Sequence, residues 1–249
     1  MKLSMMIVAC VSGSLLIGCQ SNQIADSIGS AGSLIKGVTV SREDLVASSH
    51  LSAKEMDKEA KIAPASSKYA KRLKRLTKNL HEYDGQKLNY KVYLSDEINA
   101  FAMPDGTVRV YSGLMDIMND DELLAVIGHE IGHVAHEHSL KQYRKQYLTN
   151  AARLGISAGG GTGAVVAGAF GDLGEAYLNA QFSQADELDA DAYGVHLLKK
   201  IHRNPYAAAD AQKKLKKLSS SDHSVFSSHP ASDTRIERAI EVADEVSGK

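Results

Sequence analysis

The motif H-E-x-x-H stands at residues 129–133, inside a helix that is predicted to begin after Asn119. At about 100° per residue, His129 and His133 lie about 40° apart on one face of this helix and one turn apart along its axis. Two imidazoles in this arrangement can bind one zinc ion, and Glu130 beside them is placed to act as a general base toward water. The motif therefore predicts a catalytic metal site.

A zinc ion bound by two histidines needs a third protein ligand, and a catalytic site keeps its fourth position for water. His136 lies about 10 Å along the helix axis from His129, which is too far for both to bind one ion. The metzincin spacing, with a glycine and then a third histidine, is absent because Ala135 and Glu137 flank His136. We therefore expect the third ligand from another element.

The densest acidic stretch, residues 186–191, lies in a predicted helix and offers candidates for this ligand. A solvated helix face is the alternative interpretation. Glu187 and Asp191 lie about 40° apart beside an apolar stripe, whereas Asp186 and Asp189 point to the opposite side. The stripe consists of Leu188, Ala192, Val195 and Leu198. Glu187 and Asp191 are therefore predicted to face the interior.

A ligand with a second carboxylate one turn later suits a site of two histidines and one glutamate. A ligating histidine commonly donates its other N–H to a carboxylate, which fixes its tautomer and orientation. We predict one zinc ion per chain, bound by His129, His133 and Glu187. Asp191 is predicted to accept from the outer nitrogen of His129.

The first 18 residues resemble an export signal, with Lys2 followed by an apolar stretch that is too short to span a membrane comfortably. The run Leu16-Ile17-Gly18-Cys19 resembles the bacterial lipobox, in which the cysteine becomes the lipidated first residue. An ordinary signal peptide that happens to contain a cysteine is the alternative. Gln20, rather than Asp, follows Cys19. By the usual bacterial sorting rule this indicates the outer membrane, with the protein facing the periplasm.

Cleavage before Cys19 would remove Cys10 and leave no thiol for a disulfide. Residues 19–41 are then predicted to be the lipidated N-terminus and a flexible tether, and residues 42–249 the folded domain. The formal net charge is −1. Since there is no basic surplus, nucleic acid is not an expected partner.

The fold class that these patterns predict is α+β, mostly helical, with one small antiparallel sheet beside the H-E-x-x-H helix. Three short β-type runs lie between residues 90 and 111, and Pro104-Asp105-Gly106 is a turn between the last two. Helical patterns cover about 41–63, 66–80, 119–135, 173–200, 205–218 and 232–249. Residues 154–171 contain no charge but seven glycines, so we predict a loop there and not a membrane span.

Motifs spread over most of the mature chain resemble the gluzincin-type metallopeptidases that include HtpX and BepA. Besides H-E-x-x-H, the motifs are Glu55-Met56-Asp57, Ile62-Ala63-Pro64-Ala65, Asn99-Ala100-Phe101-Ala102, Val110-Tyr111-Ser112-Gly113-Leu114-Met115, Gln181-Phe182-Ser183-Gln184 and His229-Pro230-Ala231-Ser232 with Arg235. The resemblance implies a zincin-type domain in which Glu187 is the third zinc ligand and Asp191 supports a histidine. The family commonly has Arg where this chain has Gln184, so an ion pair made by that Arg is not carried over.

The resemblance also implies roles for two further segments. Asn99, Ala100, Phe101 and Ala102 resemble the edge strand on which gluzincins bind an extended peptide by backbone pairing, although an ordinary sheet strand is the alternative. His229 and Arg235 become candidate catalytic residues. In the family the His-Pro segment lies near the active site, where His229 would either cover the open zinc position or stabilise the transition state; an exposed loop histidine is the third alternative.

The function implied is that of a membrane-anchored zinc endopeptidase that hydrolyses unfolded or misassembled cell-envelope proteins. Outer-membrane assembly factors are candidate partners. The alternative is a non-catalytic, zinc-stabilised periplasmic chaperone or assembly scaffold. The two functions differ at Glu130, because a scaffold needs the metal ligands but has no use for a general base.

Overall fold

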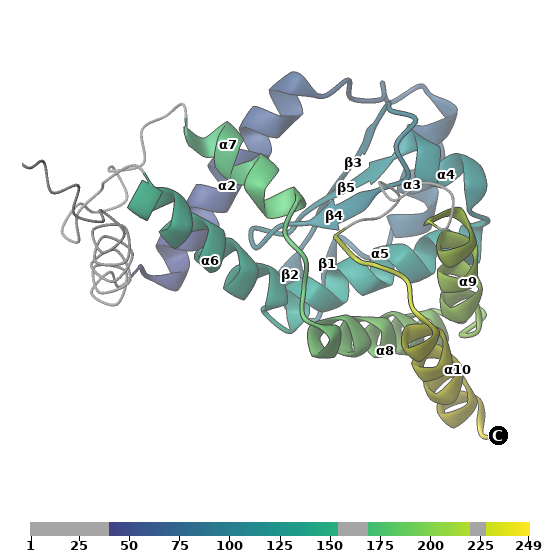
Figure 1. Cartoon of the computed structure of the whole chain (residues 1–249). Helices are drawn as coiled ribbons and strands as arrows, with labels where there is room; N and C mark the ends of the chain where they lie inside the picture. The colour runs from purple at the N-terminus through teal and green to yellow at the C-terminus, as the bar shows by residue number, and fades with distance from the viewer. Residues whose placement is uncertain (1–39, 154–168, 220–227) are drawn as a thin grey trace, which may run out of the picture.

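The computed structural model describes residues 40–153, 169–219 and 228–249 (Figure 1). The predicted export signal, Cys19 and almost all of the predicted tether lie outside the described residues, as does most of the glycine-rich stretch 154–171. Where that stretch is described, its last residues begin helix α7, Ala169–Leu178, so the predicted loop is too long at this end. Among the described helices, none combines the length and apolar character that crossing a membrane requires.

The chain enters the domain through two helices that are capped by serines. Helix α2, Arg42–Glu59, begins after Ser41, whose side chain accepts a hydrogen bond from the backbone of Asp44, as a helix N-cap does. Ser67 caps α3, Lys68–Thr77, in the same way. Both helices agree with the helical patterns predicted at about 41–63 and 66–80. Helix α2 ends at Glu59, before Pro64 could terminate it.

The main sheet has the strand order β3-β5-β4, with β3 at Asn89–Tyr93, β4 at Ala100–Ala102 and β5 at Thr107–Tyr111. Strands β4 and β5 form the predicted antiparallel hairpin. Its turn requires a glycine at position 106, because φ is 82° there and a Cβ would lie 1.9 Å from the carbonyl oxygen of Lys87.

The prediction of an entirely antiparallel sheet is wrong, because β3 runs parallel to β5. Strand β3 pairs with β5 and not with its sequence neighbour β4, and the hairpin turns β5 into the direction of β3. The alternation of apolar and polar side chains along a strand does not specify which other strand it pairs with. A second sheet, of β1 (Glu82–Tyr83) and β2 (Gln86–Lys87), was not predicted, although Asp84-Gly85 between the strands is a strong hairpin signal.

The two faces of the main sheet pack against different helices. Ala100 and Ala102 belong to the cluster that includes the apolar residues of α5, Asp120–Ala135. Phe101 and Tyr111 belong to the other cluster, with residues of α2, α7 and α6, which spans His138–Arg153. Figure 1 shows α5 running beneath the sheet, with α2, α6 and α7 beside it. The domain is therefore α+β and mostly helical, with the H-E-x-x-H helix against the sheet, as predicted.

The helix predicted over 173–200 is two helices, α7 and α8, and α8 spans Gln184–Lys200. The break has a local cause: Ser183 caps α8, its hydroxyl accepting from the backbone of Asp186 while the carboxylate of Asp186 accepts from the backbone of Ser183. Helices α9 (Ala207–Ser219) and α10 (Asp233–Ser247) agree closely with the predicted ones. Helix α4, Ser112–Ile117, and α6 have no predicted counterpart.

Small residues let α8 approach α5 closely. A Cβ on Gly128 would lie 3.0 Å from the Cα of Gly194, and a Cβ on Gly132 would lie 3.1 Å from the Cα of Ala190. Contacts this short leave no room for side chains between the two backbones. The close crossing brings the first turns of α8 against the H-E-x-x-H segment of α5.

Candidate active site

Helix α5 carries the H-E-x-x-H segment into the interior. The helix begins after Asn119, as predicted, and Asn119 and Glu122 form a capping box there, with the side chain of each accepting from the backbone of the other. His129, Glu130 and His133 are 4%, 1% and 0% exposed. Polar side chains are rarely buried so completely unless partners satisfy them.

Four side chains converge beside α5. The Nε2 atoms of His129 and His133 lie 3.1 Å apart, and the Glu187 carboxylate from α8 lies 3.6 Å from the first and 3.4 Å from the second. Nδ1 of His229 lies 3.2 Å from Nε2 of His129 and 2.8 Å from Oε1 of Glu187. All four residues are buried, and their ligand atoms lie within 4.8 Å of one another.

The spacing of these atoms suits one tetrahedral metal ion. Zinc bonds to nitrogen and oxygen are about 2.0–2.2 Å long, so neighbouring ligand atoms on a tetrahedral zinc lie about 3.3–3.5 Å apart. The observed separations scatter around this value, and imidazole with carboxylate is a donor set that zinc accepts. The residues present therefore fit the predicted ion. His136, by contrast, lies outside this group, at the end of α5.

Glu130 faces the same cluster with an unsatisfied oxygen. Its Oε1 is buried, has no hydrogen-bond partner and lies 3.7 Å from Nε2 of His229. Burial raises the pKa of Glu130 above its usual range, against the opposing charges of His229 and His129. A buried carboxylate oxygen without a partner is costly, so its position beside the four ligand atoms calls for a chemical explanation.

Asp191 lies behind His129, on the side away from the cluster. Its Oδ1 lies 2.9 Å from Nδ1 of His129, and Arg235 from α10 forms a bidentate ion pair with the same carboxylate. Burial by itself would raise the pKa of Asp191, but the hydrogen bonds and charge of Arg235 hold that pKa below its usual value. Arg235 also donates to the backbone oxygen of His229 and lies 2.6 Å from Oε2 of Glu187.

The prediction of which face of α8 is buried needs one correction. Glu187 and Asp191 do face the interior, but Leu188 and Ala192 of the predicted apolar stripe are only half-buried. The buried face is centred on Asp191 and Gly194. The stripe was placed from the apolar residues alone, so it lies to one side of the face that Asp191, with its distant partner Arg235, and Gly194 bury.

Two residues beside the cluster were not singled out from the sequence. The ring of Phe182 stacks on His133, with 4.0 Å between ring centroids, and on His229 at 5.0 Å. Nδ1 of His138 lies 3.2 Å from Nδ1 of His133. Phe182 belongs to one of the quoted motifs, whereas no sequence signal pointed to His138.

Strand β4, which contains most of the predicted substrate-binding segment, lies at the edge of the described sheet. The carbonyl oxygen of Ala102 accepts hydrogen bonds from the hydroxyls of Tyr177, at 2.6 Å, and Ser139, at 3.2 Å. The backbone N–H of Ala100 donates to the side chain of Asn99. Phe101 points away from α5 into the other core cluster. Two backbone groups of β4, the carbonyl oxygen of Ala102 and the N–H of Ala100, are therefore already hydrogen-bonded.

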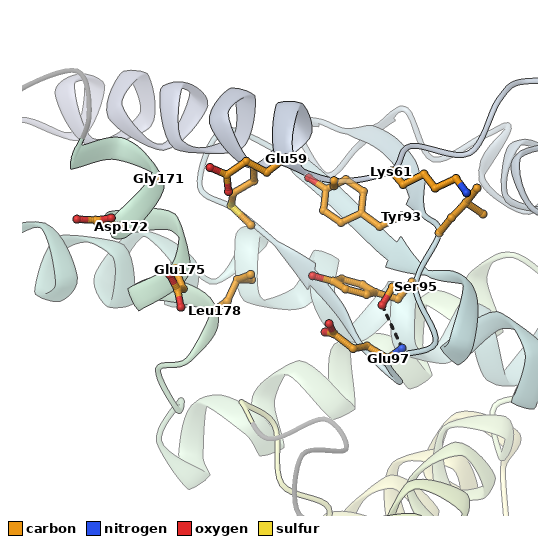
Figure 2. Close-up of a pocket in the computed structure, with 13 residues that line it drawn as sticks. Glu59, Lys61, Tyr93, Ser95, Glu97, Gly171, Asp172, Glu175 and Leu178 are labelled. Atoms are coloured by element: carbon orange, nitrogen blue, oxygen red, sulfur yellow. Dashed lines mark hydrogen bonds between the residues drawn. The ribbon is translucent and has the colours of Figure 1, made fainter.

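A cavity of about 430 Å³ lies apart from this cluster, between α2, α7 and the ends of β3 and β5. Figure 2 shows its lining, which includes four acidic residues and one lysine. These are Glu59, Glu97, Asp172, Glu175 and Lys61. No residue of the metal cluster lines this cavity, so the chemistry predicted for the chain does not depend on it.

Comparison with known proteins agrees with this geometry. The model of peptidase family M48 matches residues 67–243. Metalloprotease LoiP of Escherichia coli K12 is 41% identical over 250 residues, which cover 99% of this chain and 98% of LoiP. Metalloprotease YcaL of the same organism is 39% identical over 98% of each chain.

A beta-barrel assembly-enhancing protease of Escherichia coli K12 is more distant. It is 31% identical over 163 residues, which cover 61% of this chain but only 34% of that protein. The family match spans most of the described domain, including both helices that carry the buried histidines and glutamates. The chain therefore belongs to peptidase family M48 and is a metalloendopeptidase that resembles LoiP.

Proposed function

We propose that this metalloendopeptidase depends on zinc, is anchored to the outer membrane by a lipid on Cys19, and hydrolyses unfolded or misassembled proteins of the cell envelope. The observation that carries the catalytic part is the unpaired, buried oxygen of Glu130 beside four converging ligand atoms. A site that only bound zinc for stability would gain nothing from a buried carboxylate there.

His129, His133 and Glu187 would hold the zinc ion. When bound, zinc supplies a Lewis acid that polarises the peptide carbonyl and lowers the pKa of water. Glu130 takes a proton from the attacking water and later delivers it to the leaving amine.

His229 occupies the position in the cluster that a catalytic site keeps open. We assign it to the inhibitory role, because its Nδ1 has the spacing of a fourth metal ligand. Arg235 holds the segment in place by donating to the backbone oxygens of His229 and Pro230. Activity would then require His229 to leave the cluster. Arg235 does not react itself; its role is to position the segment that carries His229.

An extended substrate would pair with β4 along its outer edge. Main-chain pairing tolerates many sequences and requires a segment without structure of its own, which supports unfolded proteins as substrates. The hydroxyls of Tyr177 and Ser139 donate hydrogen bonds to the carbonyl oxygen of Ala102. An incoming strand has to replace these hydrogen bonds with its own.

The membrane anchor and the location are supported by the lipobox-like residues 16–19 and by the residue after Cys19. Outer-membrane assembly factors are proposed partners because one relative is named a beta-barrel assembly-enhancing protease. Incorporation of labelled palmitate into the wild-type chain, and its loss in Cys19→Ala, would support the anchor. An unlabelled wild-type chain in the membrane fraction would contradict it.

The catalytic proposal is tested by Glu130→Gln, assayed for zinc content and for cleavage of unfolded casein. We expect zinc to remain and turnover to fall on the order of a hundredfold or more, as loss of a general base does. Loss of cleavage when zinc is removed from the wild type, and its return when zinc is added back, would show that the activity depends on zinc. If Glu130→Gln retained full activity, the mechanism would be wrong. If the wild type bound zinc without cleaving, the scaffold alternative would hold.

A further inference from the structure

The two ring nitrogens of His133 face different partners. Nε2 points into the metal cluster, 3.1 Å from Nε2 of His129 and 3.4 Å from Glu187. Nδ1 points the other way and lies 3.2 Å from Nδ1 of His138. When Nε2 binds a metal, Nδ1 carries the proton of the neutral imidazole and must donate it. The atom in reach is Nδ1 of His138.

A strained turn brings His138 to this place. Helix α5 ends at Ala135, and Glu137 adopts a left-handed conformation with φ of 58° before α6 begins at His138. Such a conformation is uncommon for a residue other than glycine and is often maintained where function requires it. The turn changes the direction of the chain, and the first residue of α6 lies against the second histidine of the motif. His138 is 8% exposed.

Asp186 faces the other nitrogen of His138. Its Oδ1 lies 3.5 Å from Nε2 of His138, in the first turn of α8, next to the metal ligand Glu187. A carboxylate beside Nε2 favours the tautomer with the proton on Nε2, which leaves Nδ1 of His138 free to accept. The chain of partners therefore runs from His133 through His138 to Asp186.

We propose that His138 is a positioning residue for the metal ligand His133, accepting the hydrogen bond from Nδ1–H while Asp186 sets the tautomer of His138. His129 has a direct carboxylate partner in Asp191, whereas His133 has a neutral imidazole backed by a carboxylate. Both arrangements fix the orientation of a ligating ring and raise the basicity of its metal-binding nitrogen. This inference rests on the proposed metal site.

One competing role for His138 must be separated by experiment. His136, His138 and Asp189 also offer ligand atoms within 4.8 Å of one another, so His138 is a candidate ligand for a second ion. A nitrogen of His138 that binds a metal cannot also accept from His133. The number of ions bound per chain distinguishes the two roles.

The test uses the full-length chain in detergent with three variants. His138→Ala removes the acceptor, and His138→Asn returns an oxygen near the position of Nδ1. His136→Ala is the matched control, since it removes an exposed histidine from the same turn whose ring packs against His138 and Tyr193 and lies outside the metal cluster. Zinc affinity is measured by chelator competition, and the visible absorption of the cobalt-substituted protein reports ligand geometry.

We expect the wild type to bind one zinc ion and His138→Ala to bind it about 10–100-fold more weakly, with a shifted cobalt spectrum. His138→Asn should recover most of the affinity and the spectrum, which a merely structural defect would not allow, and His136→Ala should match the wild type. Wild-type affinity and spectrum in His138→Ala would overturn the proposal, as would a second zinc ion lost in both alanine variants. A wild type that binds no zinc would overturn the proposed function as well.

Discussion

Arg235 donates two hydrogen bonds to the carboxylate of Asp191, from Nε at 2.7 Å and from a terminal nitrogen at 2.8 Å, and both side chains are buried. The pair joins α10 to α8 directly behind His129, whose Nδ1 lies 2.9 Å from the same carboxylate. Without Arg235, a buried charge beside a metal ligand would be left uncompensated, which is strongly destabilising. The ion pair therefore allows a carboxylate to orient His129 in the interior.

Replacing Glu187 by alanine should remove a metal ligand. We expect zinc affinity to fall well beyond the roughly 10–100-fold that an outer partner contributes, and activity to fall with it. Asp189→Ala, two residues along the same helix but exposed, is the control and should change neither quantity. Metal analysis and casein cleavage measure both. A zinc loss in Asp189→Ala with normal binding in Glu187→Ala would show that the assignment of α8 is wrong.

Replacing His229 by alanine should open the fourth position of the metal cluster. Zinc should remain bound by His129, His133 and Glu187, and basal proteolysis should rise, because a neutral imidazole competes with water for the metal. Zinc content and casein turnover are the measurements. A clear loss of activity with zinc retained would assign His229 to stabilising the transition state, and no change in turnover would contradict both roles.

Removing the hydroxyl of Tyr177 should make the edge of β4 more accessible. Tyr177→Phe leaves the carbonyl oxygen of Ala102 with one donor, so we expect kcat/KM for unfolded casein to rise several-fold while zinc content stays constant. The lost hydrogen bond should cost about 1 kcal/mol of stability.

The control for this change is Tyr143→Phe, which also removes a buried hydroxyl, here one bonded to Ser48 and Ser52 of α2. It should lower stability by a similar amount without raising the rate. Equal rates in the two variants would show that the hydroxyl of Tyr177 does not oppose substrate binding.

The ionised carboxylate of Asp57 is expected to make the free energy of unfolding decrease at acidic pH. Although burial opposes it, hydrogen bonds from Arg109, Lys91 and Tyr93 lower the pKa of Asp57 to about 2. A carboxyl with a pKa near 2 when folded and near 3.9 when unfolded contributes about 2 kcal/mol, fully present above about pH 5 and lost as the pH falls toward 2. The Asp57→Asn variant should lack this contribution.

Urea unfolding of wild type and Asp57→Asn at several pH values between 7 and 2 measures the effect. The difference in unfolding free energy should be largest at neutral pH and shrink toward pH 2. Asp210→Asn, at an exposed ion pair with Lys213, should show a much smaller difference at every pH. A difference that stayed constant with pH would mean that the charge of Asp57 is not the cause.

Much of the candidate site could be predicted because its signals are local. The spacing of His129 and His133 places both rings on one helix face, and the capping residues Asn119 and Ser232 mark where helices begin. The four-residue spacing of Glu187 and Asp191 likewise indicated that both face one side. In each case the backbone geometry of a single helix relates residues a few positions apart, so these relationships could be predicted without knowing the fold.

The contacts between distant segments depend on how the whole domain packs. Continued helically, His138 would point about 140° away from His133, and only the left-handed turn at Glu137 brings it back. His229 and Arg235 reach the cluster from more than 40 positions beyond Glu187 or Asp191. The parallel pairing of β3 with β5 is likewise a contact between segments that are separated in the sequence. No local period encodes such contacts, because they depend on how separate helices and strands pack together and bury their apolar faces.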